Sequence, residues 1–119
     1  MKRILVVDDE EGIRFLYKEE LEEEGYEVEL AEGGEEALKK FSKSKPDLVI
    51  LDLKMPGMDG LEVLERIREQ DKDIPVVICT AYGEYKSDLT TWASDAYVVK
   101  SADLRELKGV IKGFLEKRE

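Results

Sequence analysis

Carboxylate, hydroxyl and ammonium side chains stand where four short apolar runs of the sequence end. Each run would form a buried strand, and the side chains at the strand ends are Asp8, Asp9, Asp52, Thr80 and Lys100. If the strands are parallel, these side chains meet at one edge of the sheet, where open α/β folds bind ligands. Three carboxylates within a few ångströms repel one another by roughly a few kcal/mol per pair at an effective dielectric near 20. Mg²⁺ suits such a site best, because it prefers carboxylate, water and phosphate oxygens.

The same residues also allow a purely structural interpretation. Asp8 and Asp9 could cap the helix that follows them, and Asp52 could simply end a strand. One acidic strand end would be unremarkable in a chain so rich in acidic residues. Three carboxylates with a hydroxyl and an ammonium at matching strand ends are much harder to explain by chance, so we favour a functional site.

The elements that must position these side chains alternate along the chain. Continuous apolar runs are typical of strands buried on both faces of a parallel sheet, and Val28 and Leu30, which alternate with glutamates, suit an edge strand. The predicted strands cover 4–7, 28–30, 48–51, 76–79 and 96–99, and helical spacing of apolar residues predicts helices that begin near residues 11, 34, 59 and 103. This alternation predicts an α/β fold with a doubly wound, five-stranded parallel sheet in the flavodoxin-like order 2-1-3-4-5.

Several residues mark the predicted helix boundaries. Gly25 suits the position just after the end of the first helix, and the second helix should end near Ser42. Asp59 begins a capping box with Glu62, and Asp103 begins another with Glu106. The apolar face of the first helix would comprise Ile13, Leu16, Tyr17 and Leu21. Residues 83–94 are rich in serine, threonine and aspartate, so a fourth helix there should be short or irregular.

Composition narrows the possible functions. The 119 residues have the length of one compact domain, and 42% of them are hydrophobic. The net charge of −10 disfavours direct binding to nucleic acid or to a membrane surface, and the absence of histidine excludes histidine-based metal sites and nucleophilic triads. Cys79 lies in an apolar run, where a buried structural thiol is expected. One cysteine, a start too short for a signal peptide and no apolar stretch of transmembrane length predict a soluble cytoplasmic protein.

Four stretches of the sequence resemble the receiver domains of two-component response regulators. They are Ile4–Glu10, Leu48–Gly60, Thr80–Ala81 and Tyr97–Lys100. The resemblance covers essentially the whole chain and extends to single-domain phosphorelay regulators. It implies a signalling domain rather than an enzyme, one that accepts a phosphoryl group from a sensor histidine kinase or a histidine phosphotransfer protein. It also implies a docking role for the first helix around residues 13–17.

The resemblance makes Asp52 the phosphoacceptor. Asp9 and Asp52 would bind Mg²⁺ together with the backbone carbonyl of Lys54, while Asp8 would act largely through a metal-bound water. A carboxylate is a poor nucleophile, but phosphoryl transfer tolerates this because its loose transition state requires positioning and charge neutralisation above all.

The resemblance also assigns the residues that bind the phosphoryl group and those that change conformation in response to it. Lys100, the Thr80 hydroxyl and the backbone N–H of Ala81 would contact its oxygens. Tyr97 would change rotamer when Thr80 moves, which alters partner binding on the face formed by 83–94, the fifth strand and the last helix. Because an aspartyl phosphate adds nearly two negative charges, movement of nearby polar groups is the expected response.

The chain departs from the family pattern near its switching surface. Ser101 stands where family members nearly always carry proline, commonly after a cis peptide bond. A cis bond before a non-proline residue costs about 3 kcal/mol, so we predict a trans Lys100–Ser101 bond and a shifted loop before the last helix. Ala93–Ser94 also replaces the usual Gly-Ala. These changes affect the switching surface more than the phosphorylation site.

Two positions are expected to set the lifetime of the phosphoryl group. Lys54 and Tyr82 lie two residues beyond Asp52 and Thr80, where side chains in this family control the access of water. We expect both to shield the acyl phosphate and slow its hydrolysis. The alternative is that both side chains simply face solvent without a kinetic effect.

Two competing functions use similar residues. Small Mg²⁺-dependent aspartyl phosphatases and phosphotransferases place the nucleophile after the first strand with a second aspartate two residues later, whereas Asp8 and Asp9 are adjacent here. A phosphorylation-independent interaction module could retain the fold, and Ser101 is compatible with it. The complete set of site residues favours the receiver over both.

Overall fold

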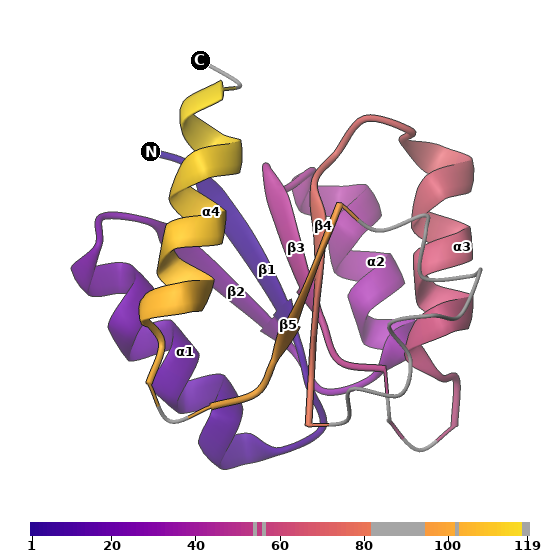
Figure 1. Ribbon diagram of the computed structural model, residues 1–119. Coiled ribbons are helices and arrows are strands. Elements are labelled where there is room, and N and C mark those ends of the chain that lie inside the picture. The colour runs from indigo at the N-terminus through magenta and orange to yellow at the C-terminus, as the bar shows by residue number, and fades with distance from the viewer. Residues whose placement is uncertain (54, 56, 82–94, 102, 118–119) are drawn as a thin grey trace.

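Five parallel strands form one sheet in the order β2-β1-β3-β4-β5, as the sequence predicts (Figure 1). The computed structural model describes residues 1–53, 55, 57–81, 95–101 and 103–117. Its strands are β1 (Arg3–Val7), β2 (Glu27–Ala31), β3 (Leu48–Leu51), β4 (Val76–Thr80) and β5 (Ala96–Val99). The order reverses between β1 and β3, so the carboxyl ends of these two strands flank the point where open α/β sheets bind ligands. All carboxyl ends lie at the bottom of Figure 1.

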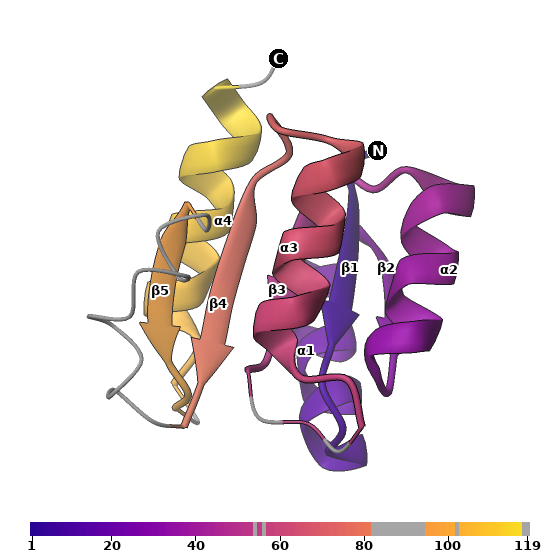
Figure 2. The same ribbon diagram turned by 90° about the vertical axis from the view of Figure 1, so that its right-hand side faces the viewer.

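Helices cover both faces of the sheet (Figures 1 and 2). Those of the described chain are α1 (Glu11–Glu23), α2 (Gly34–Ser44), α3 (Gly60–Gln70) and α4 (Arg105–Lys117). The pair α1 and α4 covers one face, and the pair α2 and α3 covers the other. The fourth helix predicted within 83–94 lies outside the described residues, so the last helix carries the label α4.

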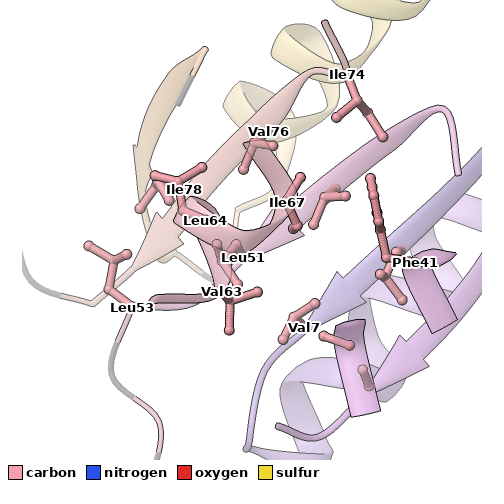
Figure 3. Close-up of a cluster of buried hydrophobic side chains, with 14 of the residues drawn as sticks. Val7, Phe41, Leu51, Leu53, Val63, Leu64, Ile67, Ile74, Val76 and Ile78 are labelled. Carbon is pink, nitrogen blue, oxygen red and sulfur yellow. The ribbon is translucent and has the colours of Figure 1, made fainter. Parts of the chain in front are cut away.

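Two apolar layers hold the sheet between its helices. The layer under α2 and α3 is shown in Figure 3, where Val7, Leu51 and Ile78 from the strands meet Val63 and Ile67 from α3. Each fully buried aliphatic side chain of this kind contributes roughly 1.5–3 kcal/mol. The strands β1, β3 and β4 are buried along their whole length apart from Arg3, which explains their continuous apolar sequences.

Most predicted boundaries are confirmed. Gly25 follows α1 with a φ of +94°, a conformation that residues with a side chain rarely adopt. Asp59 caps α3, since its Oδ1 accepts the backbone N–H of Glu62 at 3.0 Å. The second helix extends two residues beyond the predicted Ser42, to Ser44. The edge position of β2 and the burial of Cys79 are also as predicted.

Two expectations were wrong. The last helix begins at Arg105 and not at Asp103, because the Asp103 carboxylate accepts the backbone N–H of Arg105, two residues on, which forms a turn ahead of the helix. Leu16 does not belong to the buried face of α1 but is 37% exposed beside Phe15, which is 56% exposed. Helical spacing alone does not separate the edge of a buried face from the solvent face.

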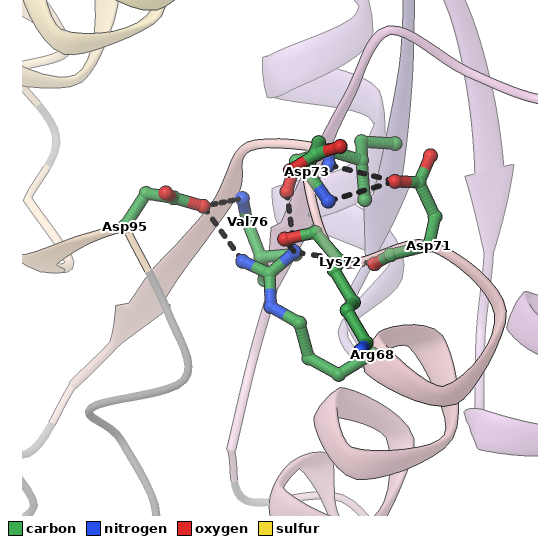
Figure 4. A network of polar contacts seen from close by, with 7 residues as sticks. Arg68, Asp71, Lys72, Asp73, Val76 and Asp95 are labelled. Carbon is green, nitrogen blue, oxygen red and sulfur yellow. Dashed lines mark hydrogen bonds and ion pairs between the residues drawn. The ribbon is translucent and has the colours of Figure 1, made fainter.

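The amino ends of the strands are joined by a polar network around Arg68 (Figure 4). The Arg68 guanidinium donates to the Ile74 carbonyl at 2.6 Å and to Asp95 Oδ2 at 2.7 Å. Asp95 also accepts the backbone N–H of Val76, at 2.8 Å. The network therefore joins the end of α3 to the starts of β4 and β5.

No cis peptide bond occurs among the described residues, so the predicted trans bond between Lys100 and Ser101 is confirmed. Ser101 Oγ accepts the backbone N–H of Asp103 at 3.1 Å, which shapes the turn that leads to α4. None of the helices in the described part of the chain is long and apolar enough to cross a membrane.

Candidate functional site

Parallel register brings three predicted site residues together at the carboxyl edge of the sheet. Val7 and Leu51 are partners in the ladder between β1 and β3, so Asp8 and Asp52 follow at the same level. The backbone N–H of Asp52 donates to the Val7 carbonyl at 3.0 Å, which continues the ladder into the site. Lys100 follows β5, and its backbone N–H donates to the Thr80 carbonyl at 2.7 Å.

Lys100 is the cation at the centre of this group. Its Nζ lies 2.7 Å from Asp8 Oδ2 and 3.3 Å from Asp52 Oδ2, and all three side chains are at most 10% exposed. Burial alone would lower the pKa of the ammonium, but the carboxylates of Asp8, Asp52 and Glu10 outweigh burial and raise this pKa above its ordinary value. Lys100 therefore remains charged throughout the physiological range.

Among the described residues, negative charge exceeds positive charge at this edge. The carboxylates of Asp8, Asp9 and Glu10 offer oxygens within 4.8 Å of one another, and the carboxylate of Asp52 also lies 3.3 Å from Lys100 Nζ. At that separation and an effective dielectric near 20, each like-charged pair repels by about 3 kcal/mol. One ammonium cannot balance four carboxylates, and a hard divalent cation with oxygen ligands fits this donor set.

Thr80 supplies the other unusual feature of the site. The residue is fully buried at the end of β4, beside β3 and β5, and its Oγ1 has no hydrogen-bond partner among the residues that the structure describes. A buried hydroxyl without a partner costs about 1–3 kcal/mol. Because such groups are rare, the Thr80 hydroxyl is notable as a donor available to an acceptor at this edge of the sheet. Ala81, which follows Thr80, is exposed.

The other predicted residues are only partly placed. Tyr97 in β5 is half-buried and packs against the apolar layer under α2 and α3. Lys54 and Tyr82, predicted to shield the phosphoryl group, lie outside the described residues.

Three residues of the site were missed by sequence reasoning. Glu10 pairs with Lys100 at 3.2 Å, and Arg14 Nη1 donates to the Asp8 carbonyl at 2.8 Å. Gly60 begins α3 so close to the residues that follow β3 that a Cβ atom there would lie 2.3 Å from the Asp52 carbonyl oxygen. Of the three, only Gly60 carried a signal in the sequence, since glycine is a poor choice for the first turn of a helix.

Comparison with known proteins places this site in a family. A model described as the response regulator receiver domain matches residues 4–112. The chain therefore belongs to the response regulator receiver domain family.

Relatives show the same domain in different contexts. Sporulation initiation phosphotransferase F of Bacillus subtilis is 40% identical over 116 residues, a match that covers 96% of this chain and 94% of that protein. Several transcriptional regulatory proteins match as well, but the chain spans only 46–50% of their length.

Solved structures agree in fold over nearly the whole chain. Response regulator TrrA of Thermotoga maritima, in complex with Mg²⁺-BeF, has a TM-score of 0.93 and 60% identity, with 96% of this chain and 99% of that chain covered. TrrA in complex with the histidine kinase ThkA gives a TM-score of 0.91 and 59% identity, with 97% and 99% covered.

Proposed function

We propose that the protein is a phosphorylation-dependent signalling switch in which Asp52 accepts a phosphoryl group. The buried Thr80 hydroxyl, which makes no hydrogen bond to the described residues, carries this proposal, because it leaves a donor available at the sheet edge that also holds the Asp52–Lys100 pair. The oxygens of a phosphoryl group on Asp52 would provide an acceptor for this donor. The donor would be the phosphohistidine of a sensor kinase or of a histidine phosphotransfer protein, and the complex of the similar TrrA with the kinase ThkA supports the first of these.

Mg²⁺ is the cofactor that this donor set accommodates. Asp8, Asp9 and Asp52 would hold the ion, with Asp8 acting largely through a metal-bound water and the backbone carbonyl of Lys54 as a further ligand. When bound, the ion supplies positive charge that offsets the crowded carboxylates and the phosphoryl oxygens. The complex of the similar TrrA with Mg²⁺-BeF supports Mg²⁺ as the cofactor.

Transfer would consist of one displacement at phosphorus. An Asp52 carboxylate oxygen forms a bond to phosphorus as the bond from phosphorus to the donor imidazole breaks, and the leaving imidazole takes up a proton. Lys100 is already 3.3 Å from Asp52 and would contact the phosphoryl oxygens, while Thr80 and the backbone N–H of Ala81 would donate to them. The chain would catalyse only this transfer and the slow hydrolysis that removes the phosphoryl group as inorganic phosphate, which Lys54 and Tyr82 would retard.

Phosphorylation would change the surface around β5. Movement of Thr80 towards the phosphoryl group would open space for Tyr97, which packs half-buried on the same side of the sheet. Val99 is 43% exposed on the same strand. The downstream protein or effector domain would bind the face formed by β5 and α4, with contributions from the segment 83–94.

The kinase would dock on a different surface. Phe15 and Leu16 expose apolar side chains on α1, which begins beside the acidic cluster. This surface would bring a histidine-bearing helix close to Asp52. We expect no direct binding to nucleic acid or to membranes, because the net charge is −10.

We also propose that residues 1–119 form a single receiver domain that works in the cytoplasm, where a lone buried thiol remains reduced.

The proposal is tested by adding acetyl phosphate and Mg²⁺ to the protein and measuring its intact mass. We expect the mass of one phosphoryl group on the wild-type chain, none on Asp52→Asn, and none without Mg²⁺. Thr80→Ala should be phosphorylated but should lack the chemical-shift changes at Tyr97. Equal labelling of wild type and Asp52→Asn would overturn the proposal and would favour a module that works without phosphorylation at this residue.

A further inference from the structure

Glu10 reaches into the site from the start of α1. Its Oε1 lies 3.2 Å from Lys100 Nζ, almost the same distance as the 3.3 Å between Lys100 Nζ and Asp52 Oδ2. Glu10 and Lys100 are 90 positions apart in sequence. The Glu10 carboxylate also lies within 4.8 Å of the carboxylates of Asp8 and Asp9. Lys100 is therefore shared among Asp8 at 2.7 Å, Asp52, and Glu10, which has no assigned role.

The backbone explains why the Glu10 side chain is available for this contact. Glu10 is the N-cap residue of α1, yet its side chain makes no capping hydrogen bond. Its N–H donates to Asp8 Oδ1 at 2.9 Å, and its carbonyl accepts the N–H of Arg14 at 3.1 Å. Main-chain contacts thus fix the residue, and the side chain can change without loss of the local fold.

We propose that Glu10 is a positioning residue that competes with the phosphoryl group for Lys100. In the unphosphorylated protein the Glu10 carboxylate draws the ammonium away from Asp52, and phosphorylation adds nearly two negative charges that draw it back. Glu10 is released to solvent when this happens. The inference rests on the proposed phosphorylation of Asp52 and adds a residue that sets how readily it occurs.

The competition has two opposite consequences. Glu10 adds negative charge beside the carboxylates that would hold Mg²⁺, so its presence strengthens metal binding. The same charge repels anionic phosphoryl donors and occupies Lys100, so its presence slows transfer once the metal site is filled. If Glu10 had a merely structural role, its replacement would weaken Mg²⁺ binding and also slow phosphoryl transfer.

The test compares Glu10→Gln with the wild-type protein over a range of Mg²⁺ concentrations. We expect the rate of phosphorylation by acetyl phosphate at saturating Mg²⁺ to rise about threefold to fivefold, the size of effect that an exposed ion pair gives. The dissociation constant for Mg²⁺, measured by NMR titration without any phosphoryl donor, should rise by a similar factor. The two rate curves should therefore cross at low Mg²⁺.

Two further variants isolate the contact with Lys100. Glu11→Gln removes the same charge from the adjacent position and should leave the maximal rate within about 1.5-fold of wild type, as expected for an exposed charge that makes no ion pair with the described residues. Glu10→Asp keeps the charge but shortens the reach, so it should retain Mg²⁺ affinity and still raise the maximal rate.

Three outcomes would overturn the inference. They are equal maximal rates for Glu10→Gln and Glu11→Gln, an unchanged Mg²⁺ affinity in Glu10→Gln, and a maximal rate in Glu10→Gln below that of wild type. If the wild-type protein takes up no phosphoryl group at all, the proposed function itself has failed, and this result is distinct from the other three.

Discussion

The amino ends and the carboxyl ends of the strands differ in how their charges are balanced. At the amino ends of β4 and β5, the Arg68 guanidinium is matched by the Asp95 carboxylate and by backbone carbonyls, and Asp95 accepts a backbone N–H as well (Figure 4). At the carboxyl ends, Lys100 faces the buried carboxylates of Asp8 and Asp52 with two more acidic side chains nearby. One end satisfies its polar groups internally, and the other leaves an excess of negative charge.

The comparison of the two ends shows that ion pairs can serve two purposes. A balanced network stabilises the fold, whereas a cluster with excess negative charge favours the binding of a cation. A balanced network with satisfied donors contributes to the folded state and has no need of a ligand. An unbalanced cluster is destabilising until a cation or a new acceptor arrives, so binding and stability become coupled. The Thr80 hydroxyl, which makes no hydrogen bond to the described residues, lies at the carboxyl end of the sheet, where negative charge is in excess.

The largest effect is expected from removal of the ammonium. Lys100→Met leaves the buried carboxylates of Asp8 and Asp52 without their cation, which should lower the free energy of unfolding by about 3 kcal/mol without Mg²⁺. Added Mg²⁺ should restore most of this loss, as measured by urea denaturation. The rate of phosphorylation by acetyl phosphate should fall about 100-fold, the cost of losing one charge-stabilising donor.

The matched change at the other end should affect stability alone. Arg68→Met removes the donor to the buried Ile74 carbonyl and leaves Asp95 without its guanidinium, so we expect a loss of about 2 kcal/mol. Mg²⁺ should not restore this loss, and the rate of phosphorylation should match that of wild type. A Mg²⁺-dependent recovery in Arg68→Met would show that the two ends do not differ as described.

A smaller effect is expected where the start of α3 meets the backbone of Asp52 and Leu53. Gly60→Ala places a Cβ atom 2.3 Å from the Asp52 carbonyl oxygen and 2.6 Å from the Leu53 Cα, so the loop must shift. We expect a loss of about 1–2 kcal/mol in the free energy of unfolding and slower phosphorylation.

Gly109→Ala provides the control for this change, because a Cβ atom there meets nothing within 4 Å. This substitution in α4 should instead raise the free energy of unfolding by about 0.5–1 kcal/mol. If Gly60→Ala behaved in the same way, the close approach between α3 and Asp52 would not constrain the site.

The smallest effect concerns pH. The raised pKa of Lys100 means that its contribution to stability is complete below the ordinary value of 10.5 and is lost only as the pH rises above it. The difference in free energy of unfolding between wild type and Lys100→Met, measured without Mg²⁺, should therefore change by less than about 0.5 kcal/mol between pH 7 and pH 9. A clear decrease by pH 9 would mean that burial dominates the pKa of Lys100.

Much of the architecture could be predicted from local sequence. Apolar runs such as Leu48–Leu51 define buried strands, and markers such as Gly25 and Asp59 define helix boundaries through nearest-neighbour chemistry. The convergence of Asp8, Asp52 and Lys100 could also be predicted from the sequence, because parallel strands align their carboxyl ends.

The features that were missed depend on contacts between distant residues. The Glu10–Lys100 pair spans 90 positions, and the requirement for glycine at position 60 arises from the backbone of Asp52. Neither contact leaves a periodic pattern in the sequence. The exposure of Leu16 likewise depends on how far the neighbouring elements extend over α1.

The central claim, that Asp52 is the phosphoacceptor, is tested most directly by chemical mapping of the acyl phosphate. The protein would be treated with acetyl phosphate and Mg²⁺, reduced with borohydride, which converts an aspartyl phosphate to homoserine, and digested for peptide mass spectrometry. We predict homoserine at position 52 alone. Homoserine at position 8 or 9, or its absence from position 52 in a protein that gained the mass of a phosphoryl group, would contradict the account.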